Sequence, residues 1–309
     1  MIRSILIAEL ALTVLGCSEV LGLGEFVESA EGGAGGSDGG GGGTAGAVGS
    51  GGAGGATECG GKPFGPESCD QTGCGALECN SGTRCVATQV CVLPGYWIDA
   101  TEVTRGQYAA WLATMPATMG QPSFCAWNTS FTADATCMNG SGVCKTSCTG
   151  HPQVCVDWCD AYAYCAALGK RLCGAIGGGA NPRAAFANPA KSQWYGACAS
   201  GFNGYLYPYG DTYDPHACNG WDKGPEATVA TGTIAECQSS ESGYEGVYDL
   251  SGNAREWDDC CDDTTGALDI CILRGGAFAS SAPYMRCDSI NEGNRSSVYG
   301  DVGFRCCAD

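Results

Sequence analysis

The sequence predicts a disulfide-rich α+β fold that is irregular and low in regular secondary structure. The 309 residues include 24 cysteines and 51 glycines. Two short segments have the apolar spacing of amphipathic helices. Beyond Arg171 the chain is dominated by Gly, Asn, Pro and short aromatic-rich pieces. The strand and helix patterns do not alternate as a doubly wound parallel sheet requires, so we expect a mixed domain with short elements.

The first predicted elements are a strand and a helix close together in the chain. Residues 96–99, Tyr-Trp-Ile-Asp, have the aromatic and branched side chains of a strand. Residues 102–112 are predicted to contain a helix, because apolar side chains recur at helical spacing at Tyr108, Trp111 and Leu112. Thr104 is placed to cap it.

A second short helix is predicted after Asp157. Val156, Tyr162 and the apolar residues of 164–168 follow a helical spacing, and Gly169 is a typical helix end. Both helices are brief.

Cysteine content and charge limit the classes of function. So many thiols indicate an oxidising compartment with most cysteines in disulfides. Zinc is a weaker explanation, because His151 and His216 are the only histidines and paired C-x-x-C knuckles are missing. A formal net charge of -18 leaves no basic surface for phosphate, so no nucleic-acid partner is expected. Cations and basic peptides remain possible partners.

The amino end is typical of an exported lipoprotein. Residues 1–16 have the charge of Arg3 and a mainly apolar run of the length of a signal peptide, too short to span a bilayer. Val-Leu-Gly-Cys at 14–17 resembles a lipobox and predicts lipidation of Cys17. Ser18 favours an outer-membrane lipoprotein or cell-surface location, anchored in the membrane through the lipid, with plain secretion as the alternative.

Residues 17–57 and 58–91 are predicted to be a tether and a small disulfide module. From about Ser29 to Ala56 the tether is nearly all Gly, Ala and Ser, without apolar periodicity. The module has few apolar residues, so its stability is expected to come from cross-links among Cys59, Cys69, Cys74, Cys79, Cys85 and Cys91. Six cysteines permit fifteen pairings, and the sequence does not choose among them. A disulfide-bonded segment that orients the main domain is favoured over a small ligand-binding module.

The number of cysteines predicts one unpaired thiol. Setting aside Cys17 and the six of the module leaves 17, an odd number. A buried and inert thiol is the commonest outcome, although an intermolecular pair or a reactive thiol is also possible. The adjacent pairs Cys260-Cys261 and Cys306-Cys307 are expected to bond distant partners, because bridging successive residues strains the peptide.

Seven motifs occur in the order of a known family. They are Ala-Thr-Glu-Val-Thr at 100–104 with Tyr108, Val-Asp-Trp-Cys-Asp-Ala at 156–161, Gly-Lys-Arg-Leu at 169–172, Tyr-Pro-Tyr-Gly at 207–210, Asp-Leu-Ser-Gly-Asn-Ala-Arg-Glu-Trp at 249–257, Arg-Gly-Gly at 274–276 and Gly-Phe-Arg-Cys at 303–306. In this order, residues 92–309 resemble the formylglycine-generating-enzyme domain, also called the sulfatase-modifying-factor domain. The resemblance implies a fold related to C-type lectin-like domains.

The resemblance also implies two disulfides and a calcium site. By position, Cys165 would pair with Cys306 and Cys198 with Cys287. Calcium would be held by the side chains of Asp249 and Glu256 and by the carbonyls of Gly252 and Ala254, an oxygen set that suits a hard cation. A solvated acidic turn is the alternative interpretation of that loop.

The catalytic residues of the family are missing. Formylglycine generators hold copper(I) with two cysteines a few residues after the Gly-Gly motif, and Ser280 and Met285 stand at those positions here. A hydroxyl and a thioether do not reproduce two thiolates, so copper is not expected.

Two functions follow from this difference. In the first, the domain is a calcium-stabilised binding scaffold whose groove, lined by residues such as Trp221, Phe278 and Tyr284, takes a peptide, protein or small ligand. In the second, it is an oxidase of protein cysteine that uses relocated thiols, which requires a reduced cysteine pair close to the groove.

Overall fold

The computed structural model describes residues 59, 70–224 and 226–309. The signal segment 1–16, the tether 17–57 and the lipidation site Cys17 lie outside the described residues. In the part that the structure describes, no helix is both long and apolar enough to cross a membrane.

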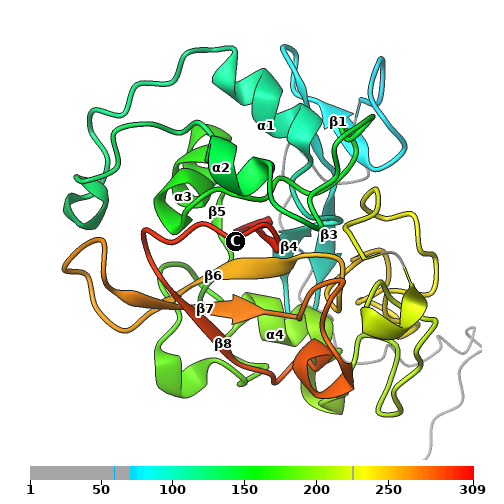
Figure 1. Cartoon of the computed structure of the whole chain (residues 1–309). Helices are drawn as coiled ribbons and strands as arrows, with labels where there is room; N and C mark the ends of the chain where they lie inside the picture. Colours follow the sequence, from blue (N-terminus) through cyan, green and yellow to red (C-terminus); the bar gives the residue numbers. More distant parts are fainter. Residues whose placement is uncertain (1–58, 60–69, 225) are drawn as a thin grey trace, which may run out of the picture. The chain divides into compact units, whose positions relative to one another are not determined.

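The described chain is a mixed α+β domain in which three small sheets are joined by long loops (Figure 1). A two-stranded hairpin pairs β1 (Glu78–Asn80) with β2 (Cys85–Ala87). The second sheet has the strand order β3-β4-β10-β5, formed by Gln89–Val92, Tyr96–Asp99, Cys306–Ala308 and Arg171–Leu172. The third has the order β8-β7-β6-β9, formed by Asn291–Asn294, Ile270–Arg274, Arg255–Cys261 and Val302–Gly303.

The helices are few and short, as the sequence predicts. The α-helices of the described residues are α1 (Arg105–Leu112), α2 (Ala135–Met138), α3 (Trp158–Ala167) and α4 (Gln193–Cys198). Single turns of 3-10 helix are η1 (Ser123–Cys125), η2 (Arg183–Ala185), η3 (Gly201–Asn203), η4 (Trp221–Lys223) and η5 (Ala282–Met285). Together with the disulfides, they confirm the predicted fold class.

The two predicted helices begin where their capping residues place them. At α1, Thr104 Oγ1 accepts a hydrogen bond from Gln107 N at 3.2 Å, and Gln107 Oε1 accepts one from Thr104 N at 3.0 Å. At α3, Asp157 and Asp160 exchange the equivalent pair of bonds. These capping boxes satisfy backbone donors that a helix start leaves unpaired, so local sequence accounts for both starts. The predicted strand at 96–99 is β4.

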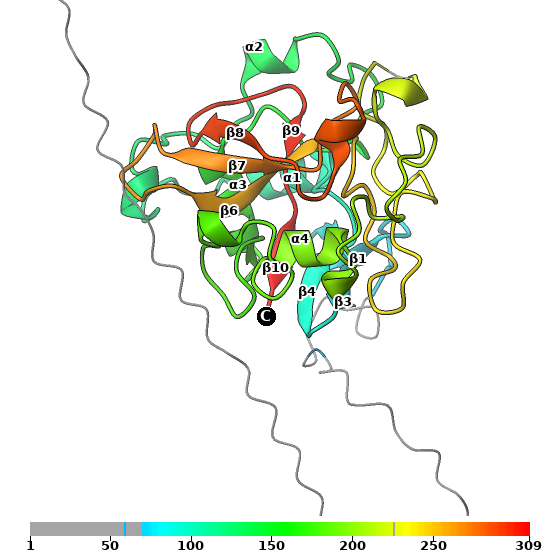
Figure 2. The ribbon, with the colours of Figure 1, turned by 90° about the horizontal axis from the view of Figure 1, so that it is seen from below.

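Helix α4 and the third sheet were not predicted. All six residues of α4 are buried, so the segment lacks the polar face that produces a helical period. The helix connects two sheets: Tyr96 of β4 donates its hydroxyl to the Gln193 carbonyl at 2.6 Å, and Trp194 donates its indole N–H to Glu256 of β6 at 2.9 Å. Seen from below, α4 lies between β6 and β4 (Figure 2).

An aromatic cluster forms the largest part of the core. The Tyr164 ring of α3 lies 5.6 Å from the Tyr108 ring and 5.4 Å from the Trp111 ring of α1. It also lies 5.5 Å from the ring of Phe304, between β9 and β10. Stacked and edge-to-face contacts of this kind add to the free energy from area burial. The core therefore joins the first helix to the carboxyl end of the chain.

The boundary expected between a module at 58–91 and a domain at 92–309 is not a structural boundary. Strand β3 runs across it, and its residues pair with β4, with Cys91 opposite Trp97 and Val92 opposite Tyr96. The Cys59–Cys91 disulfide ends on the same strand. The cysteine-rich segment thus continues into the second sheet, because a strand edge needs a hydrogen-bonded partner.

Ten disulfides join described cysteines. They are Cys59–Cys91, Cys74–Cys85, Cys125–Cys159, Cys137–Cys155, Cys144–Cys148, Cys165–Cys306, Cys173–Cys307, Cys198–Cys287, Cys218–Cys237 and Cys261–Cys271. The two pairings implied by the family resemblance are among them.

One cysteine of the described residues is free, Cys260, and it is buried in β6. Burial raises the pKa of its thiol to about 12, and the nearby Asp258 carboxylate acts in the same direction. A thiol in this state is a poor nucleophile. The expected distant partners exist for Cys306 and Cys307. Cys261 pairs with Cys271, ten residues further on, and the expectation was wrong for Cys260.

Candidate ligand-binding cleft and buried acidic loop

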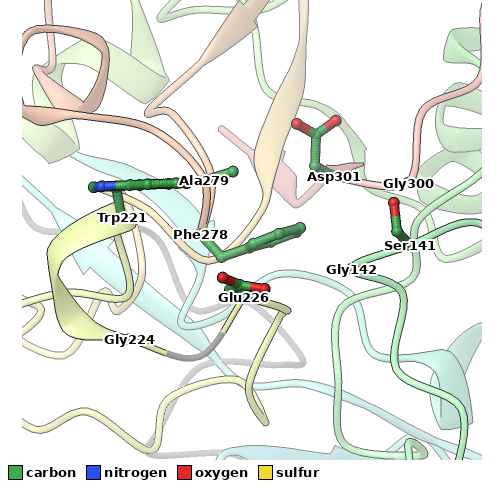
Figure 3. A pocket seen from close by; sticks show the side chains of 9 residues that line it. All are labelled: Ser141, Gly142, Trp221, Gly224, Glu226, Phe278, Ala279, Gly300 and Asp301. Carbon is green, nitrogen blue, oxygen red and sulfur yellow. The ribbon is translucent and has the colours of Figure 1, made fainter.

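An open cleft of about 710 Å³ lies at the ends of four loops (Figure 3). Trp221 of η4 and Phe278, which follows β7, form one part of its wall, and Gly300 with Asp301, ahead of β9, forms another. The lining residues are Ser141, Gly142, Trp221, Gly224, Glu226, Phe278, Ala279, Gly300 and Asp301. A volume of this size is typical of sites for small ligands or peptide side chains.

A second hollow of about 400 Å³ extends the cleft. It shares Trp221, Ala279 and Asp301 with the first and adds Tyr284 to the lining. Trp221 is 64% exposed and Tyr284 is 56% exposed. The structure thus brings the three expected groove residues, Trp221, Phe278 and Tyr284, to one continuous surface. Exposed aromatic side chains in a concave surface are typical of binding sites.

The charged groups around Trp221 are mainly acidic. Glu226 lines the cleft, and the neighbouring Asp222 carboxylate accepts a hydrogen bond from the Tyr213 hydroxyl at 3.0 Å. Asp301 forms an ion pair with Arg255, which neutralises its charge. Lys223 of η4 is basic, and its ammonium donates to the His216 carbonyl. Since Asp222 and Glu226 outnumber this one cation, the net charge at the cleft is negative.

Ser280 and Met285, which the family resemblance matches to the copper-binding cysteines, have structural contacts. Ser280 Oγ accepts a hydrogen bond from Ala277 N at 2.9 Å, and the Ser280 carbonyl accepts one from Trp221 N at 3.0 Å. Met285 is 1% exposed and packs beneath Gly220, where an added Cβ would lie 2.2 Å from its sulfur. The Ser280 carbonyl therefore holds the Trp221 backbone, and Met285 packs against Gly220, the residue before Trp221.

The loop at 249–256, expected to bind calcium, is tightly turned. Asp249, Gly252 and Asn253 all have left-handed backbones, with φ of 59°, 80° and 57°. A Cβ at Gly252 would lie 2.4 Å from the Asn219 carbonyl oxygen, so only glycine fits there. The Asn253 side chain lies deep in this loop and donates to Glu102 Oε1 at 2.9 Å.

Glu256 is held by a buried arginine. Arg305 Nη2 donates to Glu256 Oε1 at 2.7 Å and Arg305 Nε donates to Oε2 at 2.8 Å. Both side chains are at most 1% exposed. Arg305 also donates to the carbonyls of Asp99 and Tyr248. The Arg305 guanidinium of the Gly-Phe-Arg-Cys motif therefore joins the second sheet, the third sheet and the acidic loop.

Two further carboxyl groups lie in the same buried region. Glu102 is fully buried and Asp249 is 1% exposed, and Glu102 Oε2 and Asp249 Oδ1 have no hydrogen-bond partner. Burial raises the pKa of Asp249 to about 6, and burial with the nearby Asp249 charge raises that of Glu102 well above its usual value. With Glu256, three carboxyl groups face one guanidinium.

These residues fit a hard cation in part. The orphaned oxygen of Asp249 and the excess of acidic groups are what an oxygen-seeking ion requires, whereas both oxygens of Glu256 are already bonded to Arg305 and Trp194. In the described part of the chain, no three side chains of the His, Cys, Asp and Glu types converge as a metal cluster. The expected set includes only two, because its other donors are carbonyls.

Sequence reasoning did not identify Glu102 or Trp194 as part of this region. Both lie far from the loop in the chain, and the residues next to them in the sequence do not indicate that they contact it. The acidic segment 258–263 is only partly exposed. Asp262 and Asp263 are exposed, but Asp258 is buried in an ion pair with Arg274 of 2.8 Å, because it points inward from β6.

Comparisons with known proteins identify a family model and several similar proteins. The model of the sulfatase-modifying factor enzyme 1-like domain matches residues 54–309. Inactive C-alpha-formylglycine-generating enzyme 2 of Mus musculus is 30% identical over 166 residues, 50% of this chain and 48% of that protein. Formylglycine-generating enzyme of Mus musculus is 28% identical over 185 residues, 52% of this chain and 45% of that protein.

A further relative and two solved structures are similar to a larger share of the chain. Serine/threonine-protein kinase Pkn1 of Chlamydia trachomatis is 25% identical over 238 residues, 70% of this chain and 34% of that protein. The structure of CarF has a TM-score of 0.46 and 19% identity, and the match covers 69% of this chain and 85% of that one. The structure of PvdO from Pseudomonas aeruginosa has a TM-score of 0.46 and 19% identity, and the match covers 69% of this chain and 80% of that one. The chain spans about half the length or less of these curated relatives. It belongs to the sulfatase-modifying factor enzyme 1-like domain family.

Proposed function

We propose that the protein is a binding scaffold of this family and not a copper-dependent oxidase. The observation that carries the proposal is the cleft itself. It retains an aromatic, solvent-open surface at Trp221, Phe278 and Tyr284, while Ser280 and Met285 stand where soft thiolate ligands are needed. The family includes a relative named as inactive, which supports a non-catalytic use of the same domain.

The ligand that suits this cleft is a peptide or protein segment with a basic side chain. A guanidinium or ammonium group gains free energy over the face of an exposed tryptophan. Glu226 supplies a carboxylate to the same cleft, next to Phe278 (Figure 3), and the net charge of -18 attracts cations from a distance. An acidic ligand would meet repulsion from each of these sources.

Binding can be tested with a library of short peptides that differ in charge. Arginine- or lysine-containing peptides are expected to bind, and Trp221→Ala is expected to weaken them at least about ten-fold, as loss of a central aromatic contact does. Phe202→Ala is the matched control, because Phe202 is 82% exposed and does not line the cleft. Equal affinity of acidic and basic peptides, or equal effects of the two variants, would contradict the proposal.

The oxidase alternative requires a reduced cysteine pair near the cleft. Among the described cysteines only Cys260 is without a disulfide, and it is buried. No observation therefore favours this function. Copper(I) titration combined with oxygen uptake on cysteine-containing peptides tests it, and turnover to an aldehyde would replace the scaffold proposal.

Calcium at the acidic loop is part of the proposed function. Asp249 and Glu256 would provide side-chain oxygens, and Gly252 and Ala254 would provide carbonyls. A bound cation would offset the excess negative charge of Glu102, Asp249 and Glu256 over Arg305 and would thereby stabilise the fold.

We predict that calcium raises the melting temperature relative to chelator. At 100 times the dissociation constant, a single site adds about 2.7 kcal/mol to the free energy of unfolding. Asp249→Asn is expected to reduce the effect, because it removes one ligand charge, whereas Asp288→Asn on the surface is expected to leave it intact. Coincident melting curves with calcium and with chelator would exclude the site.

Export and membrane anchoring complete the proposal. The many disulfides indicate an oxidising compartment, and lipidation of Cys17 would place the domain at the outer membrane. Cys17→Ser is expected to release the protein from the membrane fraction, with loss of the lipid mass from the amino-terminal peptide by mass spectrometry.

A further inference from the structure

A short loop at 144–148, Cys-Lys-Thr-Ser-Cys, follows the cleft wall at Ser141 and Gly142. Its ends are joined by the Cys144–Cys148 disulfide, with a sequence separation of 4. The three residues between the cysteines are exposed, and Cys144 is partly exposed. The disulfide is therefore accessible to a solvent-borne thiol from the Cys144 side.

Cys144 lies beside an imidazole and close to a cation. His151 Nε2 is 3.7 Å from Cys144 Sγ, and His151 Nδ1 is 3.1 Å from Thr228 Oγ1. The contact with Thr228 orients the ring so that Nε2 faces the sulfur. Arg105 Nη1 donates to the Cys144 carbonyl at 2.8 Å. Burial and the nearby Arg105 lower the pKa of His151, so the ring is neutral near pH 7. With its proton on Nε2, the neutral ring would donate to a thiolate formed at Cys144, and Arg105 would place a positive charge nearby.

The other disulfides of the described chain lack this arrangement. Cys165–Cys306 and Cys173–Cys307, for example, are buried in the core. Cys74–Cys85 is a useful comparison, because it also closes a short loop outside the core, with a separation of 11. The Cys85 sulfur lies 3.7 Å from the Gly73 carbonyl oxygen, and neither histidine of the sequence has a contact with that disulfide in the structure.

We propose that Cys144–Cys148 is a redox-active disulfide that oxidises pairs of thiols in a peptide or protein. This inference goes beyond the binding function and does not depend on it. The cleft wall at Ser141 and Gly142 would bring a bound segment within reach of the disulfide. Loss of the disulfide would release a short loop only, since a cross-link constrains the unfolded chain less as its loop shortens.

The exchange is balanced without a further oxidant. A substrate thiolate attacks Cys144 Sγ, the Cys144–Cys148 bond breaks, and the Cys148 sulfur leaves and takes up a proton. The second substrate thiolate then attacks the substrate sulfur of the mixed disulfide and expels Cys144 Sγ, which is stabilised by His151 and Arg105. The substrate gains a disulfide and loses two electrons and two protons, and the protein becomes a dithiol. A low-pKa leaving thiol accelerates the second step.

The first test measures opening of the disulfides in the native full-length protein. It is treated with dithiothreitol for increasing times, quenched with iodoacetamide and mapped by mass spectrometry. Cys144 and Cys148 are expected to be labelled at least ten-fold faster than Cys74 and Cys85. His151→Gln is expected to slow labelling at 144 and 148 about ten-fold and to leave labelling at 74 and 85 unchanged. Equal rates at the two disulfides, or no effect of His151→Gln, would overturn the proposal.

The second test measures oxidation of a peptide with two cysteines, in the absence of oxygen and with the protein in excess. One peptide disulfide is expected for each protein molecule whose Cys144–Cys148 disulfide becomes reduced. The Cys144→Ala/Cys148→Ala variant is expected to form none, while Cys74→Ala/Cys85→Ala retains the reaction. Melting temperatures of both variants verify that they are folded, and His151→Gln, which retains all cysteines, provides the comparison if either variant is unfolded. Retained oxidation in the Cys144→Ala/Cys148→Ala variant would refute the assignment.

Discussion

At the residue scale, Arg305 explains why the carboxyl-terminal motif belongs to this fold. Its guanidinium is fully buried and neutralises Glu256, and it bonds to backbone carbonyls of segments far apart in the chain. A buried ion pair contributes little to stability compared with an apolar replacement of both partners, but removal of one partner leaves an uncompensated charge. Here the nearby Glu102 and Asp249 increase that penalty.

We predict that Arg305→Met lowers the free energy of unfolding by about 3 to 5 kcal/mol, the typical cost of breaking a buried pair. Arg286→Met is the matched control, because its pair with Asp288 has side chains that are 37% and 35% exposed. Such surface pairs contribute about 0 to 1 kcal/mol. Urea denaturation measures both, and a similar loss in the two variants would show that Arg305 has no special role.

At the scale of elements, the start of α3 combines helix capping with charge burial. Asp157 and Asp160 form the capping box, and Asn128 donates to Asp160 Oδ1 at 2.8 Å. Burial raises the pKa of Asp157 to about 6, and burial together with the neighbouring Asp157 raises that of Asp160 to about 8. The helix start is therefore most favourable when the pair carries a proton.

The pH dependence follows from these directions. Because the folded-state pKa values lie above the ordinary value, the protonated pair stabilises the fold fully at low pH, and the contribution is lost as pH rises through about 6 to 8. We predict that Asp160→Asn reduces the loss of stability between pH 5 and pH 9 by about 1 to 3 kcal/mol. Melting temperatures across this range test it, and parallel curves for the two proteins would exclude the coupling.

At the scale of the whole molecule, long-range disulfides stabilise a fold that has little regular secondary structure. Cys165–Cys306 joins α3 to β10 across a separation of 141 residues, and Cys198–Cys287 spans 89. Cross-links between distant residues reduce the entropy of the unfolded chain more than short ones do. They allow long loops, including those around the cleft, to remain irregular.

We predict that Cys165→Ala/Cys306→Ala lowers the free energy of unfolding by about 5 kcal/mol, compared with about 3 kcal/mol for Cys74→Ala/Cys85→Ala, from loop length in the chain-entropy model. Burial of Cys165 and Cys306 adds a cavity cost in the same direction. Urea denaturation of the two variants tests the order. A smaller effect at the longer loop would show that the model does not apply here.

The sequence by itself determined the features that depend on neighbouring residues or on composition. Thr104 and Asp157 act on backbone donors within three residues, so both helix starts could be predicted. The odd number of cysteines predicted a buried free thiol, and the order of motifs predicted the family. Helix capping depends on residues close together in the chain, and the number of cysteines and the order of motifs can be read directly from the sequence. None of them depends on tertiary contacts.

Only the tertiary structure decided which distant groups meet. Glu102 reaches the 249–256 loop through Asn253, and Trp194 of the buried helix α4 bonds to Glu256. The boundary expected at residue 91 disappeared because β3 needs β4 as its partner. Such contacts depend on how all the elements pack together. A hydrogen bond to a residue far away in the chain does not change the spacing of apolar residues around the side chain that makes it, so the local sequence does not reveal the bond.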